Sequence, residues 1–377
     1  MIRSVYPELA RIVIAILIAF VAIVFTAGQR IDLENLAKGE ENTSRMEQEN
    51  GRPYTACTVK DIKEILDACN SEKNKEGCNS PCRMLWLGNS QLHYINQYKE
   101  GNHLAPYWLK SLWNNPECIE PLGCSLPNAD FQEYLILSRY AALRMPIQLL
   151  IMELVFDDLR EDALRDDFNE ILSSRAGAEI RQTSPTAEAI VGRFLLRNKE
   201  AGGGEQGALS GTIQESVEKW LNGTLSASWG LWASRPQIEG NVYLGLYNLR
   251  NYLLGIKPTT VRKMIRTRYD LNMQALQDIL QDCWQRRIPV LLYIAPIRQD
   301  KPIPYDRKEY AEWKQEVTAV ARGFGARLVN LEQLIPGDMW GSYTVDDVDF
   351  MHFQGPGHQM VAEALLPHVL AIVGRKN

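Results

Sequence analysis

The sequence lacks an excess of positive charge and has no run of basic residues. Lys and Arg number 41 against 46 for Asp and Glu, so the formal net charge is −5. Because nucleic-acid binding needs clustered cations, a nucleic-acid partner is not expected. Internal repeats are missing as well. With 45% hydrophobic and 23% charged residues in 377, the composition is that of a globular chain, which excludes a disordered, collagen-like or multi-pass membrane protein.

One stretch near the start departs from this average. From Ile12 to Ala27 the chain reads IVIAILIAFVAIVFTA, sixteen residues without a charge. At about 1.5 Å per residue, such a helix falls slightly short of the ~30 Å hydrocarbon core, a difference that flanking residues or a thinned bilayer cover. Arg3 and Arg11 precede the run, and acidic residues dominate the stretch after it. The positive-inside rule therefore predicts a single-pass anchor within residues 1–29 and a periplasmic or extracellular bulk.

Two other interpretations of this run stay open. A signal peptide cleaved after Ala27 would need small residues before the cut, and Phe25 is bulky. A buried core helix would show a polar face, which this run does not have. We favour the anchor, and either the anchor or the signal peptide places the rest of the chain outside the cytoplasm.

Six of the seven cysteines lie between positions 57 and 124. An extracytoplasmic location would allow them to form disulfides. Cys118 and Cys124 enclose a short segment and are the expected pair, while Cys283 is expected to be a buried free thiol. The remaining four allow three pairings that their spacing does not distinguish, and a zinc site is the less favoured alternative for them because the spacing is irregular. These four are Cys57, Cys69, Cys78 and Cys82.

A change of pattern at residue 82 divides the chain. Residues 30–81 begin polar and become rich in cysteine, and we interpret them as a tether that follows the anchor. From residue 82 onward short apolar runs alternate with helical stretches, which predicts an α/β domain over residues 82–377. The expected strands cover 83–87, 147–155, 289–295 and 326–331. The expected helices cover 131–145, 272–287 and 308–323.

Strands that alternate with helices predict a parallel sheet with helices on both faces. Ligands of such sheets bind at the carboxyl ends of the strands, where Ser90, Asp157 and the segment after Ala295 should emerge. Between about residues 160 and 268 the alternation stops, and we interpret this part as a helical insertion. It is either a lid or docking surface beside the site, or a subdomain that only packs.

Two short motifs at opposite ends of the predicted domain carry the side chains for nucleophilic chemistry. Gly88-Asn89-Ser90 follows the first strand, and Asp349 precedes His352 by three residues. A serine at a strand-to-helix turn exposes its hydroxyl beside helix N–H groups that stabilise an oxyanion, and Gly88 is expected to permit the turn. A histidine can take the serine proton while a carboxylate holds the other ring nitrogen.

These motifs, together with the α/β alternation, resemble the SGNH or GDSL-like hydrolase superfamily. Its members have a G-D-S turn after the first strand and D-x-x-H near the end. The resemblance covers roughly residues 82–377 and implies a three-layer, flavodoxin-like fold. It also implies that Ser90 is the nucleophile, His352 the general base and Asp349 its orienting carboxylate, with the Ser90 N–H in the oxyanion hole. No metal or other cofactor is expected for this chemistry.

The chain departs from the family pattern at two positions. Asn89 replaces the usual aspartate of G-D-S. After the second strand, Asp157-Asp158 stands where the family has asparagine and aspartate, so the usual amide donor of the oxyanion hole is missing. An ionised Asp157 would repel an oxyanion. Asn128 is an alternative donor, and the acidic pair could instead form a salt-bridged turn with Arg160.

The other histidines have structural interpretations. His93 is expected at the surface and His358 at the cap of the last helix. The acidic residues near His352 offer a further alternative, a divalent metal site of a phosphoesterase, although no second histidine–carboxylate cluster accompanies them. These acidic residues are Asp346, Asp347 and Asp349.

The arrangement of one membrane span and an outward-facing SGNH-like domain resembles anchored cell-envelope acyl-transfer proteins, such as those of teichoic-acid D-alanyl transfer and alginate O-acetylation. This resemblance implies a membrane-anchored serine esterase or O-acyltransferase. Its substrate would be an acylated glycan or glycolipid, and its partner a multi-pass membrane acyltransferase. The alternative is a catalytically degenerate domain that binds glycan or scaffolds an envelope-modification complex.

Overall fold

The computed structural model describes residues 43–44, 48–49, 52–53, 55–72, 82–162, 164–201, 261–344 and 347–374. All of them belong to one of the two compact units into which the chain divides. The predicted membrane segment at 12–27 and residues 202–260 of the predicted insertion lie outside the described residues. Within the described part of the chain, no helix combines the length and the apolar character needed to cross a membrane.

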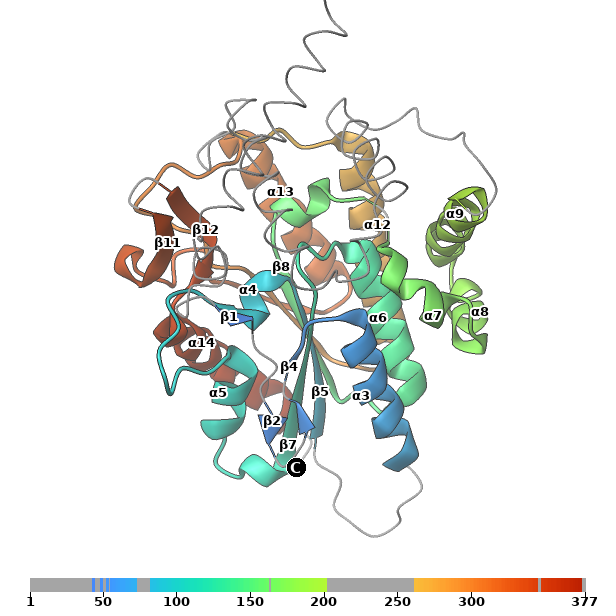
Figure 1. Ribbon diagram of the computed structural model, residues 1–377, viewed down its shortest axis with the longest axis horizontal. Coiled ribbons are helices and arrows are strands. Elements are labelled where there is room, and N and C mark those ends of the chain that lie inside the picture. The colour runs from blue at the N-terminus through green and yellow to red at the C-terminus, as the bar shows by residue number, and fades with distance from the viewer. Residues whose placement is uncertain are drawn as a thin grey trace, which may run out of the picture. The chain divides into compact units, whose positions relative to one another are not determined.

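Six parallel strands form the central sheet (Figure 1), in the order β10-β9-β8-β5-β7-β4. This confirms the predicted parallel α/β sheet. Five of the strands have the flavodoxin-like order 2-1-3-4-5, and β4 adds an edge strand beside β7. The strands are β4 (Thr55–Ala56), β5 (Cys82–Gly88), β7 (Ile119–Ser125), β8 (Leu149–Leu154), β9 (Val290–Ile294) and β10 (Arg327–Asn330).

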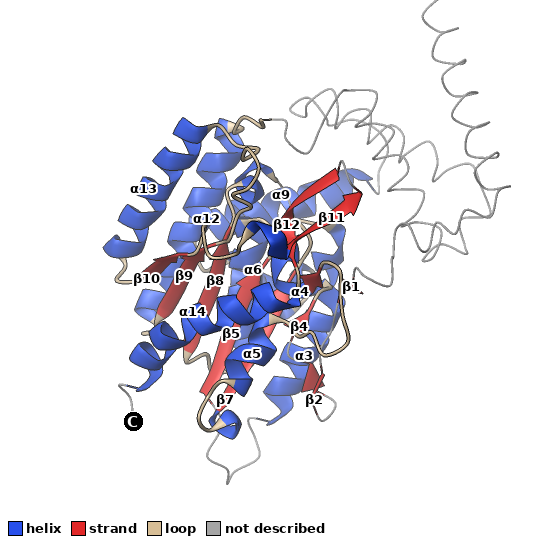
Figure 2. Ribbon diagram, turned by 90° about the vertical axis from the view of Figure 1, so that its left-hand side faces the viewer, coloured by secondary structure: helices blue, strands red, loops and turns tan. Residues whose placement is uncertain are grey.

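Helices cover both faces of the sheet. α5 (Ala105–Ser111) and α14 (Gly355–Val373) cover one face and lie in front of the strands in Figure 2. The other face is covered by α3 (Val59–Glu72), α6 (Phe131–Arg144), α12 (Arg266–Gln285) and α13 (Arg307–Gly323).

Each face of the sheet has its own buried apolar cluster. Within β5, Trp86 belongs to one cluster, while its neighbours Leu85 and Leu87 belong to the other. Successive side chains of a strand point to opposite faces, so burial of both faces requires an uninterrupted apolar run. This is why the strands read as continuous hydrophobic segments in the sequence.

Helix starts follow from local capping. Asp130 precedes α6 and accepts a hydrogen bond from the Glu133 N–H at 2.9 Å. Asp306 precedes α13 and accepts from the N–H groups of Lys308 and Glu309. Such caps satisfy backbone donors that have no partner inside the helix. α12 has no side-chain cap and begins at Arg266, six residues before the predicted start.

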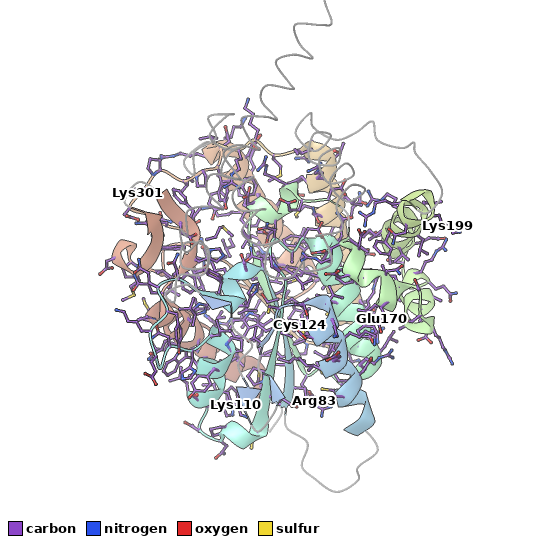
Figure 3. All side chains as sticks on the ribbon, viewed as in Figure 1. Arg83, Lys110, Cys124, Glu170, Lys199 and Lys301 are labelled. Carbon is purple, nitrogen blue, oxygen red and sulfur yellow. The ribbon has the colours of Figure 1, made fainter. Side chains whose placement is uncertain are left out.

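Nothing in the sequence pattern predicts β7, and the disulfide expected there is wrong. Cys118 and Cys124 lie at opposite ends of an extended segment that rises about 3.3 Å per residue. Cys118 is exposed, Cys124 is buried among the strands (Figure 3), and both are free thiols. Cys283 is a buried free thiol, as predicted.

Pro121 is the reason that β7 does not resemble a strand in the sequence. A proline removes one ladder donor and is confined to positions without a partner on one side. β5 pairs with β7 along its whole length, and Pro121 lies opposite Met84. On the other side β4 pairs only with Gly123 and Cys124. The edge strand is therefore too short to need a donor from Pro121.

The segment interpreted as a tether also contributes to the α/β unit. β4 pairs with β7, and α3 packs against α6, with Ile62 and Leu66 fully buried. The Tyr140 hydroxyl of α6 donates to Asp67 of α3 at 2.7 Å. The boundary at residue 82 therefore needs correction, because residues 55–72 belong to the fold.

The described part of the predicted insertion packs against the main core. It contains α7 (Asn169–Leu172), α8 (Arg175–Arg181) and α9 (Pro185–Ala201). Ile180 of α8 and Phe194 of α9 belong to the same buried cluster as α6 and α12. These helices therefore extend the layer on that face of the sheet.

Asn272 of α12 fastens two segments of this layer. Its side chain accepts from the Phe131 N–H at 3.1 Å and donates to the carbonyls of Leu159 and Glu161. We predict that Asn272→Leu lowers the free energy of unfolding by roughly 3 kcal/mol, because it leaves buried backbone groups without partners. Urea unfolding measures this. Gln274→Leu on the exposed side of the same helix is the control, and an equal effect of both changes would contradict the assignment.

Candidate active site

The topology places one serine at the point where the strand order reverses. β5 lies between β7 and β8, which continue the sheet in opposite directions. In open parallel sheets the crevice outside such a pair of strand ends is the usual ligand site. α4 (Ser90–His93) begins there, one residue after β5 ends (Figure 1). Ser90 is half-buried at the first position of this short helix.

Ser90, His352 and Asp349 form a continuous hydrogen-bonded chain. The Ser90 Oγ lies 2.8 Å from the His352 Nε2, and the His352 Nδ1 lies 2.9 Å from the Asp349 Oδ2. The carboxylate accepts the proton on Nδ1, so Nε2 is left as the acceptor for the serine hydroxyl. The two predicted motifs, 262 positions apart at Ser90 and His352, therefore meet at one strand end.

Asp349 is held by more than the histidine. Its Oδ1 accepts from the Met351 and His352 N–H groups at 2.8 and 3.0 Å, and its Oδ2 accepts from the Asn96 Nδ2 at 2.8 Å. Burial raises the pKa of this carboxyl, but the nearby imidazole and the hydrogen bonds outweigh burial and lower the pKa overall. Asp349 is therefore a buried, ionised carboxylate beside the imidazole.

A bulge brings Asp349 and His352 together. They lie on β12 (Asp347–Phe353), which forms an antiparallel hairpin with β11 (Trp340–Thr344). Val348 and Phe353 are five residues apart, but their partners on β11, Ser342 and Trp340, are only two residues apart. The three extra residues bend β12, as bulges beside active sites commonly do. A regular strand would hold residues 349 and 352 about 10 Å apart.

The turn that presents Ser90 is built around Asn89. The Asn89 side chain accepts from the Gln91 N–H at 2.9 Å and so caps α4. Gly88 is needed for space and not for a left-handed conformation. A Cβ on Gly88 would lie 2.8 Å from Leu92 and 2.9 Å from the Glu153 carboxyl.

Two buried carboxyl groups surround Asn89. The Asn89 N–H donates to the Glu153 Oε2 at 3.0 Å, and the Asn89 Nδ2 donates to both oxygens of Asp158 at 2.9 and 3.1 Å. Burial raises the pKa of Glu153 to about 8 and that of Asp158 well above its ordinary value. Glu153 is therefore mostly protonated at neutral pH, and the base of the serine turn carries little negative charge.

Asp157 and Asn128, the other predicted site residues, do not contact Ser90. Asp157 forms ion pairs with Arg160 at 3.3 Å and with Arg262, which supports the salt-bridged turn. Asn128 is exposed, with φ of 51°, in the turn after β7. Asparagine tolerates this left-handed conformation, which accounts for its presence there.

The expectations for the other histidines are wrong. His93 is buried, and its Nδ1 donates to the Ser125 Oγ at 2.6 Å. His358 is also buried and donates from Nε2 to the Tyr94 carbonyl at 3.2 Å, so it does not cap α14. Burial lowers the pKa of both imidazoles to about 3, and both are therefore neutral.

Several residues of the site have no signal in a motif. Asn96 supports Asp349, and Arg298 donates to the carbonyls of Gly341 at 2.8 Å and Asp349 at 3.4 Å. Glu153 is the one charged residue of the apolar run 147–155. A charge inside a buried strand marks a polar contact at that position. This was the available signal for Glu153.

Within the described residues, no group of three or more His, Cys, Asp or Glu side chains is arranged to hold a metal ion. Asp346 and the side chain of Asp347, which belong to the alternative metal site, lie outside the described part. The Asp349 carboxylate is already saturated by four hydrogen bonds.

No protein-family model and no curated protein matches this sequence. Similar solved structures include a protein described as an acylhydrolase from Bacteroides fragilis, with 12% identity and a TM-score of 0.38 over 82% of this chain and 95% of that chain. A GDSL-like lipase from Bacteroides thetaiotaomicron has 10% identity and a TM-score of 0.38 over 82% and 97%. A protein described as a platelet activating factor from Streptococcus pneumonia has 11% identity and a TM-score of 0.37 over 82% and 94%. We draw nothing further from likenesses at these identities.

The raised pKa of Glu153 predicts a pH dependence of stability. In the unfolded chain this carboxyl loses its proton near its ordinary pKa of 4.5, whereas in the folded state it keeps the proton up to about pH 8. The folded state binds more protons at Glu153 between these values, so the contribution of Glu153 to stability is greatest below pH 4.5 and falls as pH rises to about 8.

We therefore expect the unfolding free energy of wild type to fall by a few kcal/mol relative to Glu153→Gln over this range. Glutamine retains an acceptor for the Asn89 N–H, so the comparison isolates the charge. Denaturant unfolding at a series of pH values measures the difference. Glu312→Gln on the exposed side of α13 is the control. A constant difference between wild type and Glu153→Gln would refute the prediction.

Proposed function

We propose that this protein is a serine esterase or O-acyltransferase in which Ser90 is the nucleophile, His352 the general base and Asp349 the carboxylate that orients the imidazole. The hydrogen-bonded chain from the Ser90 Oγ through both nitrogens of His352 to Asp349 carries this proposal. A hydroxyl becomes a good nucleophile when a neutral imidazole accepts its proton, and the ionised Asp349 stabilises the imidazolium that results.

The reaction balances with these three residues. The Ser90 Oγ attacks the carbonyl carbon of an acyl ester while its proton passes to the His352 Nε2. The tetrahedral intermediate collapses, and the leaving alcohol takes the proton from His352. An acyl ester on Ser90 remains. A second hydroxyl, from water or from a sugar, then attacks this ester, gives its proton to His352 and releases the acyl group as Ser90 recovers its proton.

The oxyanion needs donors, and backbone groups supply them in this proposal. The Ser90 N–H is at the first position of α4, where a helix N–H has no partner within the helix. The family's asparagine is replaced by Asp157, whose charge is balanced by Arg160 and Arg262. This balance weakens the repulsion that a free carboxylate would exert on the oxyanion.

The cellular setting is a proposal from the sequence. The uncharged run at 12–27 supports a single-pass membrane anchor with the described unit in the periplasm or outside the cell. An acylated glycan or glycolipid of the envelope is then the substrate, and a multi-pass membrane acyltransferase is the partner that would supply or receive acyl groups.

Ser90→Ala tests the nucleophile. We expect it to lower the release of acetate from an aryl acetate by about 10³-fold or more, and to abolish labelling by a serine-directed phosphonate. The stability should change little, because Ser90 is half-buried and its hydroxyl bonds to His352. Ser111→Ala, at an exposed position at the end of α5, is the control. Turnover and labelling that survive in Ser90→Ala would overturn the assignment.

The alternative is a degenerate domain that binds glycan or scaffolds an envelope complex. The observation that favours it is the absence of the asparagine donor, because Asp157 occupies that position. The same experiment decides between the two. The scaffold is supported if wild-type protein binds glycan but neither hydrolyses an aryl acetate nor reacts with the phosphonate. Both reactions are measured over pH values on either side of the ordinary pKa of histidine.

The membrane anchor is tested on the full chain in expressing cells. We expect the protein to stay with the membrane pellet after an alkaline carbonate wash, because an uncharged helix is held by the hydrocarbon core. Protease added from outside spheroplasts should degrade the described unit. Release of the protein by the wash, or protection from the protease, would contradict the anchored, outward-facing arrangement.

A further inference from the structure

We propose that Gln91 is a positioning residue that sets the distance between Ser90 and His352, by fastening the strand that carries the histidine to the helix that carries the serine. This inference rests on the proposed function. Gln91 directly follows Ser90 and is 2% exposed. It belongs to no motif in the sequence.

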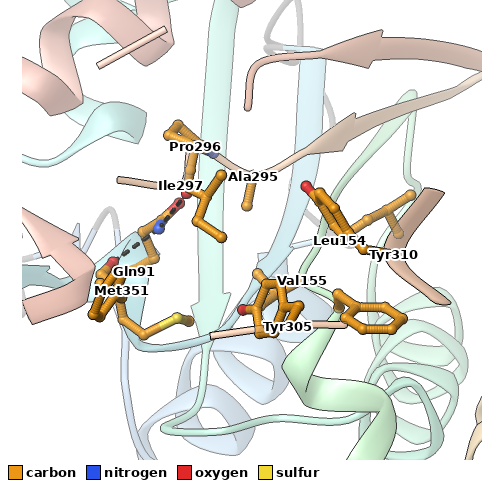
Figure 4. A pocket seen from close by; sticks show the side chains of 11 residues that line it. Gln91, Leu154, Val155, Ala295, Pro296, Ile297, Tyr305, Tyr310 and Met351 are labelled. Carbon is orange, nitrogen blue, oxygen red and sulfur yellow. Dashed lines mark hydrogen bonds between the residues drawn. The ribbon is translucent and has the colours of Figure 1, made fainter. Parts of the chain in front are cut away.

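The Gln91 amide joins three segments of the chain. Its Nε2 donates to the Met351 carbonyl at 2.8 Å and to the Pro296 carbonyl at 3.1 Å, as Figure 4 shows. Met351 directly precedes His352, and Pro296 lies in the segment after β9. One side chain thus connects α4, β12 and the carboxyl end of the central sheet.

The chemistry of these contacts fixes the orientation of the amide. Both acceptors are carbonyl oxygens, and the NH₂ group has two protons to donate. The Oε1 of Gln91 is buried and has no hydrogen-bond partner among the described residues. The side chain is therefore held by its donors.

The hairpin needs such a fastening because it forms a sheet of its own. β11 and β12 pair only with each other among the described strands and are not part of the six-stranded sheet. The Asn96 N–H donates to the Phe353 carbonyl at 3.1 Å, and Gly341 packs so closely on Asn96 that a Cβ there would lie 1.8 Å from its Cγ. Arg298 adds bonds to the carbonyls of Gly341 and Asp349.

Gln91 differs from these other fastenings in what it joins. The side chains of Asn96 and Arg298 hold the Asp349 end of the bulge and the facing strand, and the Asn96 N–H holds Phe353, but neither residue is adjacent to Ser90. Gln91, which directly follows Ser90, binds the carbonyl of Met351, which directly precedes His352. The backbone from Ser90 to Gln91, the hydrogen bond from Gln91 to the Met351 carbonyl and the peptide bond from Met351 to His352 therefore link the two residues. This link limits how far the Ser90 Oγ and the His352 Nε2 can move from their 2.8 Å contact. The reacting atoms depend on it, since an error of about 1 Å can cost about 100-fold in rate.

The test uses Gln91→Met, which keeps the length and volume of the side chain and removes both donors. We expect a 10- to 100-fold lower kcat for an aryl acetate, a similar decrease in the rate of phosphonate labelling, and a KM within about twofold of wild type. In hydrogen exchange on the full chain, the amides of residues 349–353 should exchange faster, because the hairpin opens more often.

Two control variants separate positioning from loss of stability. Gln299→Met removes an amide that also donates to two backbone carbonyls, those of Ile297 and Glu332, without contacting β12. Asn272→Leu removes a buried amide whose hydrogen bonds go to Phe131, Leu159 and Glu161 and not to the hairpin. Both should keep the wild-type kcat and the wild-type exchange of residues 349–353.

The two arms of the experiment fail in different ways. Unchanged exchange of residues 349–353 in Gln91→Met would overturn the fastening itself. Faster exchange with an unchanged kcat and labelling rate would overturn the positioning role. Wild-type protein that the phosphonate does not label would overturn the proposed function, and with it the catalytic part of this inference, while the exchange result would still report on the hairpin.

Discussion

The contact between the Ser90 hydroxyl and the His352 imidazole depends on how a small hairpin is held against the end of a larger sheet. Ser90 is fixed by the sheet, because α4 begins one residue after the central strand β5. His352 belongs to a hairpin with its own two-stranded pairing. The ladder of the central sheet therefore does not reach His352. In our proposal the alignment comes from the Gln91 amide and the Arg298 guanidinium, which donate to carbonyl groups of the hairpin, and from the backbone bond of the Asn96 N–H to the Phe353 carbonyl.

Electrostatics divides the site into a charged side and a neutral side. Asp349 is ionised, since the His352 imidazole and three further hydrogen bonds outweigh the cost of burial. At the base of the serine turn, burial of Glu153 and of the His93 imidazole outweighs their hydrogen bonds, so both groups are mostly neutral at pH 7. The negative charge nearest to the imidazole is thus the one that stabilises a positive imidazolium. A charged Glu153 beside the turn would oppose a developing oxyanion.

The sequence allowed prediction of the parallel sheet and of the residues that meet at its end, because both depend on local patterns. Continuous apolar runs indicate strands that are buried on both faces. A serine directly after such a run lies at the carboxyl end of its strand, where ligands of parallel sheets bind. β7 was not predicted because a proline within a run argues against an inner strand. Pro121 is tolerated here because the neighbouring edge strand β4 is very short. The contribution of residues 55–72 to the fold was not predicted either, because β4 is only two residues long. A two-residue strand has no period to detect.

The supporting residues of the site were beyond prediction for a different reason. The side chains of Gln91 and Arg298 donate to carbonyl groups that are far away in the sequence, and a carbonyl is the same for every residue type. Sequence patterns record which side chains are present but not which backbone groups lie in front of them. Asn96 donates to the Asp349 carboxylate across 253 positions, and no local pattern links these two residues. Only Glu153 had a visible signal, as a charge within an apolar strand.

The two departures from the family pattern are balanced within the described contacts. An aspartate at position 89 would place a third carboxyl between Glu153 and Asp158, and it would lose the amide protons that Asp158 now accepts. Asparagine at this position provides both an oxygen that caps α4 and a donor for Asp158. At position 157 the carboxylate is paired with two arginines. In each case a neighbour of suitable charge or hydrogen-bonding capacity satisfies the residue that this chain carries, so neither Asn89 nor Asp157 leaves an unbalanced buried group beside the serine turn.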